Sequence, residues 1–157
     1  MYLILLCLLT AGPDKDSADK YLDDSGQLTH TLTVSNLQGG IVGQTGDRWT
    51  VETSGAWTRV RVLGKRGETP VAKGKLTKKQ LAGLARALET YDLAGLKSEK
   101  VGKPAANAHV ITVEFGDTKA ELTLAAGAPL PAVSKTKIPG RYVGILQAVQ
   151  RRAIPRR

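Results

Sequence analysis

Cysteine, histidine and aromatic residues are all scarce in this chain of 157 residues. There is one cysteine, there are two histidines, and aromatic residues make up 4% of the total. A single cysteine excludes an internal disulfide framework and a cysteine-ligated zinc site, and two histidines exclude a histidine-rich metal site. Few aromatics argue against nucleic-acid binding by base stacking. The stability of the protein must therefore come from packing, and we expect no metal site.

Acidic residues are also few, because 14 of them face 23 lysines and arginines and leave a net charge of +9. The first 24 residues carry −3, so the remainder carries +12. A basic body of this kind attracts anionic partners such as nucleic acid, lipid headgroups or an acidic protein surface. A solvated basic surface without a partner is the simpler interpretation.

The longest apolar run covers residues 1–11 and ends abruptly at Gly12-Pro13-Asp14. It is too short to span a bilayer as a helix, which needs about 20 residues. It predicts an export signal and an extracytoplasmic protein, secreted or periplasmic, although the run contains no lysine or arginine and no clear cleavage site. A lipid anchor at Cys7, a buried N-terminal strand and a misassigned start are the alternatives. Residues 12–26 are polar and acidic and predict a flexible leader.

Alternating apolar residues predict several strands. Residues 28–37 form the first, with Leu28, His30, Leu32 and Val34 facing inward. Residues 41–43 are expected to resume it, and residues 49–62 form a hairpin whose Arg59 and Arg61 make a basic outer face. Residues 71–76 are a candidate for one more short strand. A tight turn at Gly116-Asp117 joins a second hairpin over residues 109–124.

Two helices follow from spacing and capping. Thr77 and Gln80 form a capping box, with Leu76 and Leu81 as its hydrophobic staple, and they begin a helix over residues 78–93. We expect Gly95 to end this helix. A closing helix begins near Pro139, and its buried stripe is Tyr142, Ile145, Leu146 and Val149.

Residues 27–157 are therefore predicted to form one α+β domain. The expected architecture is an antiparallel sheet of four to five strands with two helices packed on one face. The expected order along the chain is strands, helix, hairpin, helix.

No set of side chains predicts catalysis. His109 and His30 fall on strand faces, and nothing in the spacing links His109 to Ser98, Ser134 or Asp117. Glu114 and Glu121 lie on an outward face, where pairing with Lys119 explains them better than glycoside hydrolysis does. We therefore expect no catalytic residues, no cofactor and a protein that is not an enzyme.

Two segments are candidates for binding. The glycine-rich segment Gly39-Gly40-Ile41-Val42-Gly43 lacks the spacing of a phosphate loop, so it is either a bend between strands or an exposed segment that docks a partner. A basic run places two lysines in the first turn of the first helix, against the helix dipole, which an anion or acidic partner would relieve. A solvated face is the alternative. The run consists of Lys73, Lys75, Lys78 and Lys79.

The chain also resembles a known family, the emfourin-type inhibitors of thermolysin-like metalloproteases. The resemblance rests on three segments, a closing hairpin and a final helix, and it covers about residues 36–150. The segments are Asn36-Leu37-Gln38-Gly39-Gly40-Ile41-Val42-Gly43, Leu76-Thr77-Lys78-Lys79-Gln80-Leu81-Ala82-Gly83-Leu84 and Tyr91-Asp92-Leu93-Ala94-Gly95-Leu96. It implies a contact segment from Gln38 to Gly43. An export signal and longer loops at 64–76 and 125–139 depart from the family pattern, and exported bacterial proteins of unknown activity share the layout.

The expected function is that of an exported, monomeric, non-enzymatic domain that binds another protein, and the resemblance implies a metalloprotease as that protein. The alternative is a basic envelope protein that binds polyanions such as lipid headgroups, acidic glycans or nucleic acid. A third interpretation, an uncharacterised enzyme, requires a nucleophile beside His109. Salt separates the first two, because polyanion binding weakens steeply with ionic strength and a packed protein interface does not.

Overall fold

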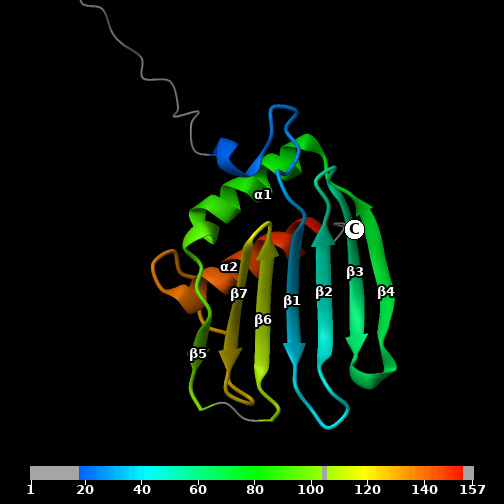
Figure 1. Ribbon diagram of the computed structural model, residues 1–157, viewed down its shortest axis with the longest axis vertical. Helices are drawn as coiled ribbons and strands as arrows, with labels where there is room; N and C mark the ends of the chain where they lie inside the picture. The colour runs from blue at the N-terminus through cyan, green and yellow to red at the C-terminus, as the bar shows by residue number, and fades with distance from the viewer. Residues whose placement is uncertain (1–17, 104–105, 154–157) are drawn as a thin grey trace, which may run out of the picture.

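A seven-stranded sheet forms the body of the protein (Figure 1). The computed structural model describes residues 18–103 and 106–153. The strand order is β4-β3-β2-β1-β6-β7-β5, and all neighbours are antiparallel except β5 and β7. The strands are β1 (Leu32–Gln38), β2 (Thr45–Val51), β3 (Ala56–Leu63), β4 (Glu68–Lys75), β5 (Glu99–Val101), β6 (His109–Phe115) and β7 (Thr118–Leu124).

Helix α2 (Ile138–Ala153) lies behind the sheet in Figure 1, and α1 (Lys78–Thr90) runs across the upper end of the strands. The other face of the sheet is left uncovered. Short 3-10 helices occur at η1 (Ala18–Tyr21), η2 (Gly64–Arg66) and η3 (Leu93–Gly95). One hydrophobic core joins the sheet to the helices. Its fully buried members include Leu84, Leu88, Ile111, Leu122, Tyr142 and Ile145.

The α+β class agrees with the structure, but the predicted sheet of four to five antiparallel strands is wrong, and so is the predicted order of strands, helix, hairpin and helix. The sheet has seven strands and is mixed, because β5 lies between α1 and the hairpin and pairs in parallel with β7. The three residues of β5 are too few for an alternating pattern. The candidate strand at residues 71–76 corresponds to β4, which begins earlier, at Glu68. The first three residues of β4 are exposed and include Pro70, so their sequence resembles a loop. Residues 41–43 do not resume β1 but belong to the turn that follows it.

Helix α1 begins as predicted but ends earlier. Both halves of the capping box between Thr77 and Gln80 are present. The helix ends at Thr90 because Asp92, and not Gly95, takes the left-handed conformation, with φ 47°. Two interactions of the Asp92 side chain offset the strain of this conformation. The carboxylate accepts a hydrogen bond from the Gly95 amide and forms an ion pair with Arg141 of α2, 2.8 Å away. The prediction of a helix over residues 78–93 is therefore three residues too long.

The second hairpin and the closing helix are confirmed. β6 and β7 pair through the turn at Gly116-Asp117, with Phe115 opposite Thr118. Pro139 lies in the first turn of α2, and all four predicted stripe residues are buried.

Two predicted strand faces are wrong. His30 precedes β1 and is exposed, with its ring edge-on to Phe115. Arg59 and Arg61 do not form a basic outer face, because Trp57 is the buried residue of β3 and the odd-numbered positions follow it to the side of the helices. There Asp47 pairs with both arginines, and the Arg59 guanidinium lies over the Trp49 ring. Burying the large indole of Trp57 stabilises the fold more than burying Val60 and Val62 would, so Trp57 decides which face of β3 turns toward the core.

The N-terminal part of the described chain packs against α1 and is not a free leader. From Ala18 onward the chain contacts α1 through η1, and Leu22 bridges to Leu28. Tyr21 is 5% exposed and its ring meets Phe115 edge-on at 5.7 Å. The predicted leader over 12–26 thus includes residues that belong to the core. The predicted signal over 1–11 lies outside the described residues, and within the described ranges no helix is long and apolar enough to cross a membrane.

Replacing Tyr21 with alanine tests whether this segment is part of the fold. Tyr21→Ala removes a buried ring, so we expect the free energy of unfolding to fall by about 3 kcal/mol. Urea denaturation followed by circular dichroism measures the change. Tyr21→Phe keeps the ring and is the matched control. Equal stability of Tyr21→Ala and the parent protein would show that residues 18–28 are not part of the core.

Candidate functional site

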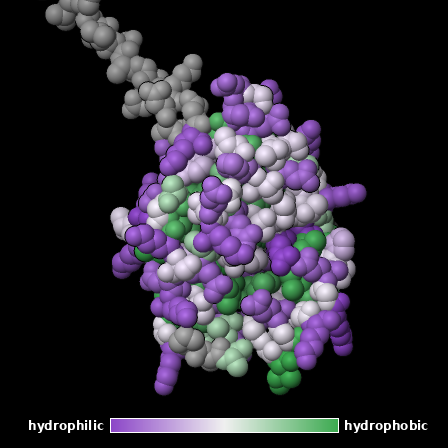
Figure 2. Space-filling model, in the orientation of Figure 1, coloured by the Kyte–Doolittle hydropathy of each residue, from purple (hydrophilic) through white to green (hydrophobic). Residues whose placement is uncertain are grey.

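The loop between β1 and β2 presents apolar side chains to solvent. Ile41 is fully exposed, at 102% of its reference area, and Val42 is 58% exposed. Figure 2 shows an apolar projection at the lower end of the molecule, over this loop. β-Branched apolar residues at a protruding tip are unusual for a solvated loop, so this is the strongest candidate for a contact with another molecule.

One side of the loop is fastened to the segment before β6. The Gly39 amide donates a hydrogen bond to the Ala108 carbonyl at 2.8 Å, and the Gln38 side chain donates to the Asn107 carbonyl. A Cβ on Gly39 would lie 2.9 Å from the Ala106 carbonyl oxygen. Gly39 is therefore needed because two backbones approach closely.

The other side rests on the hairpin between β3 and β4. The Lys65 amide donates to the Val42 carbonyl at 2.9 Å, and the Gly43 amide closes the turn by donating to the Gly40 carbonyl at 3.0 Å. Gly64 has φ +62°, and a side chain there would collide with the Val42 carbonyl. The tip is thus held from both sides, which lowers the ordering cost of any contact it makes.

The six residues predicted as a contact segment divide into two groups in the structure. Gln38, Gly39, Gly40 and Gly43 shape and fasten the loop. Ile41 and Val42 are the ones whose apolar side chains project from it.

The basic run lies at the junction of β4 and α1. Lys73 and Lys75 lie two residues apart, on one face of the edge strand β4. Lys78 and Lys79 occupy the first turn of α1. All four are exposed, and none forms an ion pair within residues 18–103 and 106–153. Lysines and Pro70 on an edge strand also discourage pairing with a second sheet.

The structure does not bring the candidate acid–base residues together. His109 is hydrogen-bonded to the Asn36 side chain, and burial lowers the pKa of its imidazole. Ser98 accepts instead from the Glu121 amide at 3.0 Å, and Ser134 accepts from the amides of Thr136 and Lys137. Asp117 lies at the far end of β6 from His109.

The predicted pairing of an outward glutamate with Lys119 is confirmed, because Glu114 and Lys119 form an ion pair at 2.7 Å across β6 and β7. Glu121 accepts a hydrogen bond from the Thr123 hydroxyl at 2.9 Å. No group of histidine, cysteine and carboxylate side chains in the described part of the chain is arranged to hold a metal ion.

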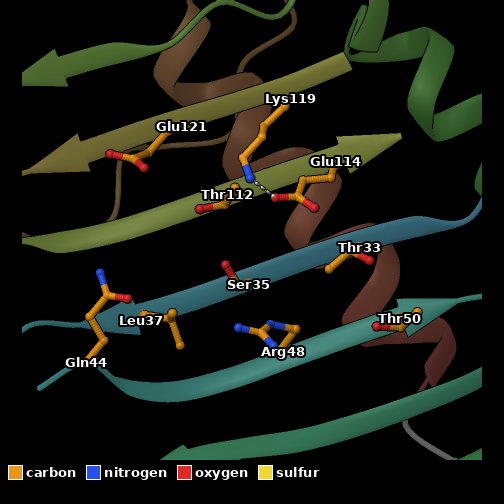
Figure 3. Close-up of a pocket in the computed structure, with 10 residues that line it drawn as sticks. All are labelled: Thr33, Ser35, Leu37, Gln44, Arg48, Thr50, Thr112, Glu114, Lys119 and Glu121. Atoms are coloured by element: carbon orange, nitrogen blue, oxygen red, sulfur yellow. Dashed lines mark ion pairs between the residues drawn. The ribbon is translucent and has the colours of Figure 1, made fainter. Parts of the chain in front are cut away.

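Sequence reasoning missed a polar hollow on the uncovered face of the sheet (Figure 3). It has a volume of about 550 Å³. Its side chains come from strands that are distant in sequence, so only alternating hydroxyl residues along single strands hinted at it. The lining residues are Thr33, Ser35, Leu37, Gln44, Arg48, Thr50, Thr112, Glu114, Lys119 and Glu121.

No family model matches this chain, and no curated protein matches its sequence.

Alanine substitutions at Gly39 and Gly40 test whether Gly39 is needed for the close approach that holds the loop. Gly39→Ala forces a Cβ against the Ala106 carbonyl, so we expect it to destabilise the protein by about 1–3 kcal/mol. Gly40→Ala meets nothing closer than 3.7 Å and serves as the control, with a change within about 0.5 kcal/mol. Thermal and urea unfolding measure both. Equal effects of the two variants would contradict the close approach at Gly39.

Proposed function

We propose that this protein is a non-enzymatic binding domain that engages another protein through the β1–β2 tip, and that the partner is a thermolysin-like metalloprotease. The observation that carries the proposal is the full exposure of Ile41 on a loop fastened from both sides. The family resemblance supports the choice of partner, because it implies the same segment.

The physical case for the tip is one of preorganisation. Burying one isoleucine side chain contributes about 1.5–3 kcal/mol. The hydrogen bonds of Gly39, Gly43 and Lys65 hold the loop before contact, so less of that free energy is lost to ordering. Such a projection fits a cleft that accepts an apolar side chain.

An aspartate at the tip tests this function. We expect the folded full-length chain to inhibit a thermolysin-like protease, and Ile41→Asp to weaken inhibition at least about 30-fold, as for loss of a binding hot spot. Leu130→Asp is the matched control, because Leu130 is also an exposed apolar loop residue, at 42% exposure. Inhibition constants from a peptide-cleavage assay measure the effect.

The two parts of the proposal fail differently in this assay. No inhibition by the folded parent protein rejects the protease as the partner. Inhibition that Ile41→Asp leaves unchanged rejects the tip as the contact.

A second function, polyanion binding, is favoured by the four exposed lysines at the β4–α1 junction. Within the two described ranges these lysines lack acidic partners, although Lys78 and Lys79 begin a helix where positive charge is unfavourable. A polyanion laid across this junction would supply the missing negative charge.

Salt dependence tests this second function. If the four lysines each contact one phosphate of a single-stranded oligonucleotide, a logarithmic plot of affinity against salt has a slope of about −3. Changing Lys73, Lys75, Lys78 and Lys79 to glutamine should flatten it. The control changes Lys97, Lys100, Lys135 and Lys137, which are also exposed, and removes the same charge elsewhere. Equal slopes for the two quadruple variants would exclude this junction as the site. Fluorescence anisotropy provides the affinities.

A further inference from the structure

The hollow on the uncovered face of the sheet, between β2 and β7, is a second candidate binding site, separate from the loop tip. The hollow of about 550 Å³ is comparable with small-molecule sites, which span roughly 300–1,000 Å³. Figure 3 shows its side chains rising from four strands around a floor made by β1 and β6.

Strand register arranges these side chains in two rows across the sheet. Arg48 pairs with Ser35, Ser35 with Thr112, and Thr112 with Glu121. Neighbouring strands are about 4.8 Å apart, so a row offers a polar group at each such step. The second row lies two residues away from the first on every strand. It consists of Thr50, Thr33, Glu114 and Lys119.

Four hydroxyls line the hollow without a protein partner among the described residues. Within residues 18–103 and 106–153, no hydrogen bond involves the side-chain oxygens of Thr33, Ser35, Thr50 or Thr112. Ser35 is only 6% exposed, yet its hydroxyl lines the hollow. A deeply placed hydroxyl that both donates and accepts, without a partner of its own, points to a ligand that also donates and accepts.

The charges of the hollow cancel. Arg48 and Lys119 equal Glu114 and Glu121 in number. Lys119 and Glu114 form a 2.7 Å ion pair, Arg48 pairs with Glu68 of the edge strand β4, and Glu121 accepts a hydrogen bond from the Thr123 hydroxyl. This balance contrasts with the net charge of +9 for the whole chain. A charged ligand therefore gains little here from simple attraction, whereas a neutral one still finds donors and acceptors.

One apolar side chain, that of Leu37, lines the hollow. Leu37 is 6% exposed and lies in the lining beside Gln44. A ligand with many hydroxyls, no net charge and one C–H face matches the whole set. We propose that the hollow binds a short neutral carbohydrate. Aromatic side chains are absent from its lining, so stacking adds nothing and the dissociation constant falls in about the millimolar range.

Nuclear magnetic resonance titration of the ¹⁵N-labelled full-length chain tests this site. The probes are cellotriose, maltotriose and triacetylchitotriose, with trigalacturonate and trialanine as charged and peptide comparisons. At least one neutral trisaccharide should shift amide signals of β1, β2, β6 and β7 that surround the hollow, and leave the signals of residues 40–42 at the loop tip unchanged.

A double variant assigns the binding to the hydroxyl floor. Thr33→Val with Thr112→Val removes two hydroxyls at nearly constant shape, and we expect affinity to fall about tenfold. The control is Thr58→Val, on the same face of the sheet in β3 but outside the lining. Amide spectra of both variants verify that they are folded.

Three results would overturn the proposal. The first is that no neutral trisaccharide shifts these signals at tens of millimolar. The second is that trigalacturonate or trialanine binds more tightly than every neutral sugar. The third is that the double variant binds as well as Thr58→Val does. None of them bears on the loop tip, so the proposed function stands or falls separately.

Discussion

Burial of a single face of the sheet is the constraint on which the rest of the molecule depends. Tyr142 and Ile145 of α2, together with Leu84 and Leu88 of α1, belong to one buried core with the apolar residues of the central strands, and this core excludes water from that side. The opposite face must then remain compatible with water. Hydroxyls and cross-strand ion pairs occupy it for that reason, and a polar hollow is a natural product of this arrangement.

The strand register also determines the conformation of the loop between β1 and β2. Because register fixes where β1 and β2 stop, the connecting loop is held close to two other segments, the backbone before β6 and the β3–β4 hairpin. The apolar tip is therefore held in a defined conformation by segments that the sheet positions. A tip of the same sequence on a free loop would lose its defined shape.

Local signals predicted much of the fold, and non-local pairing accounts for what they missed. The capping box at Thr77, the turn at Gly116 and the buried stripe of α2 are each written within a few residues. The parallel strand β5 depends on a distant partner, and the buried indole of Trp57 reverses the faces expected for Arg59 and Arg61. In the same way, the loop at Gly39 was recognisable as a segment, whereas the hollow requires the register of four strands and has no local signature.

The packing of Tyr21 limits how the chain can be shortened. Its ring lies against Phe115, and Leu22 bridges to Leu28, so these residues close one end of the core. A proteolytic cut or an engineered start after Tyr21 would open that end and expose the Phe115 ring. A start at residue 27, where composition alone places the domain boundary, would give a damaged fold, and any processing that preserves the protein has to occur upstream of this tyrosine.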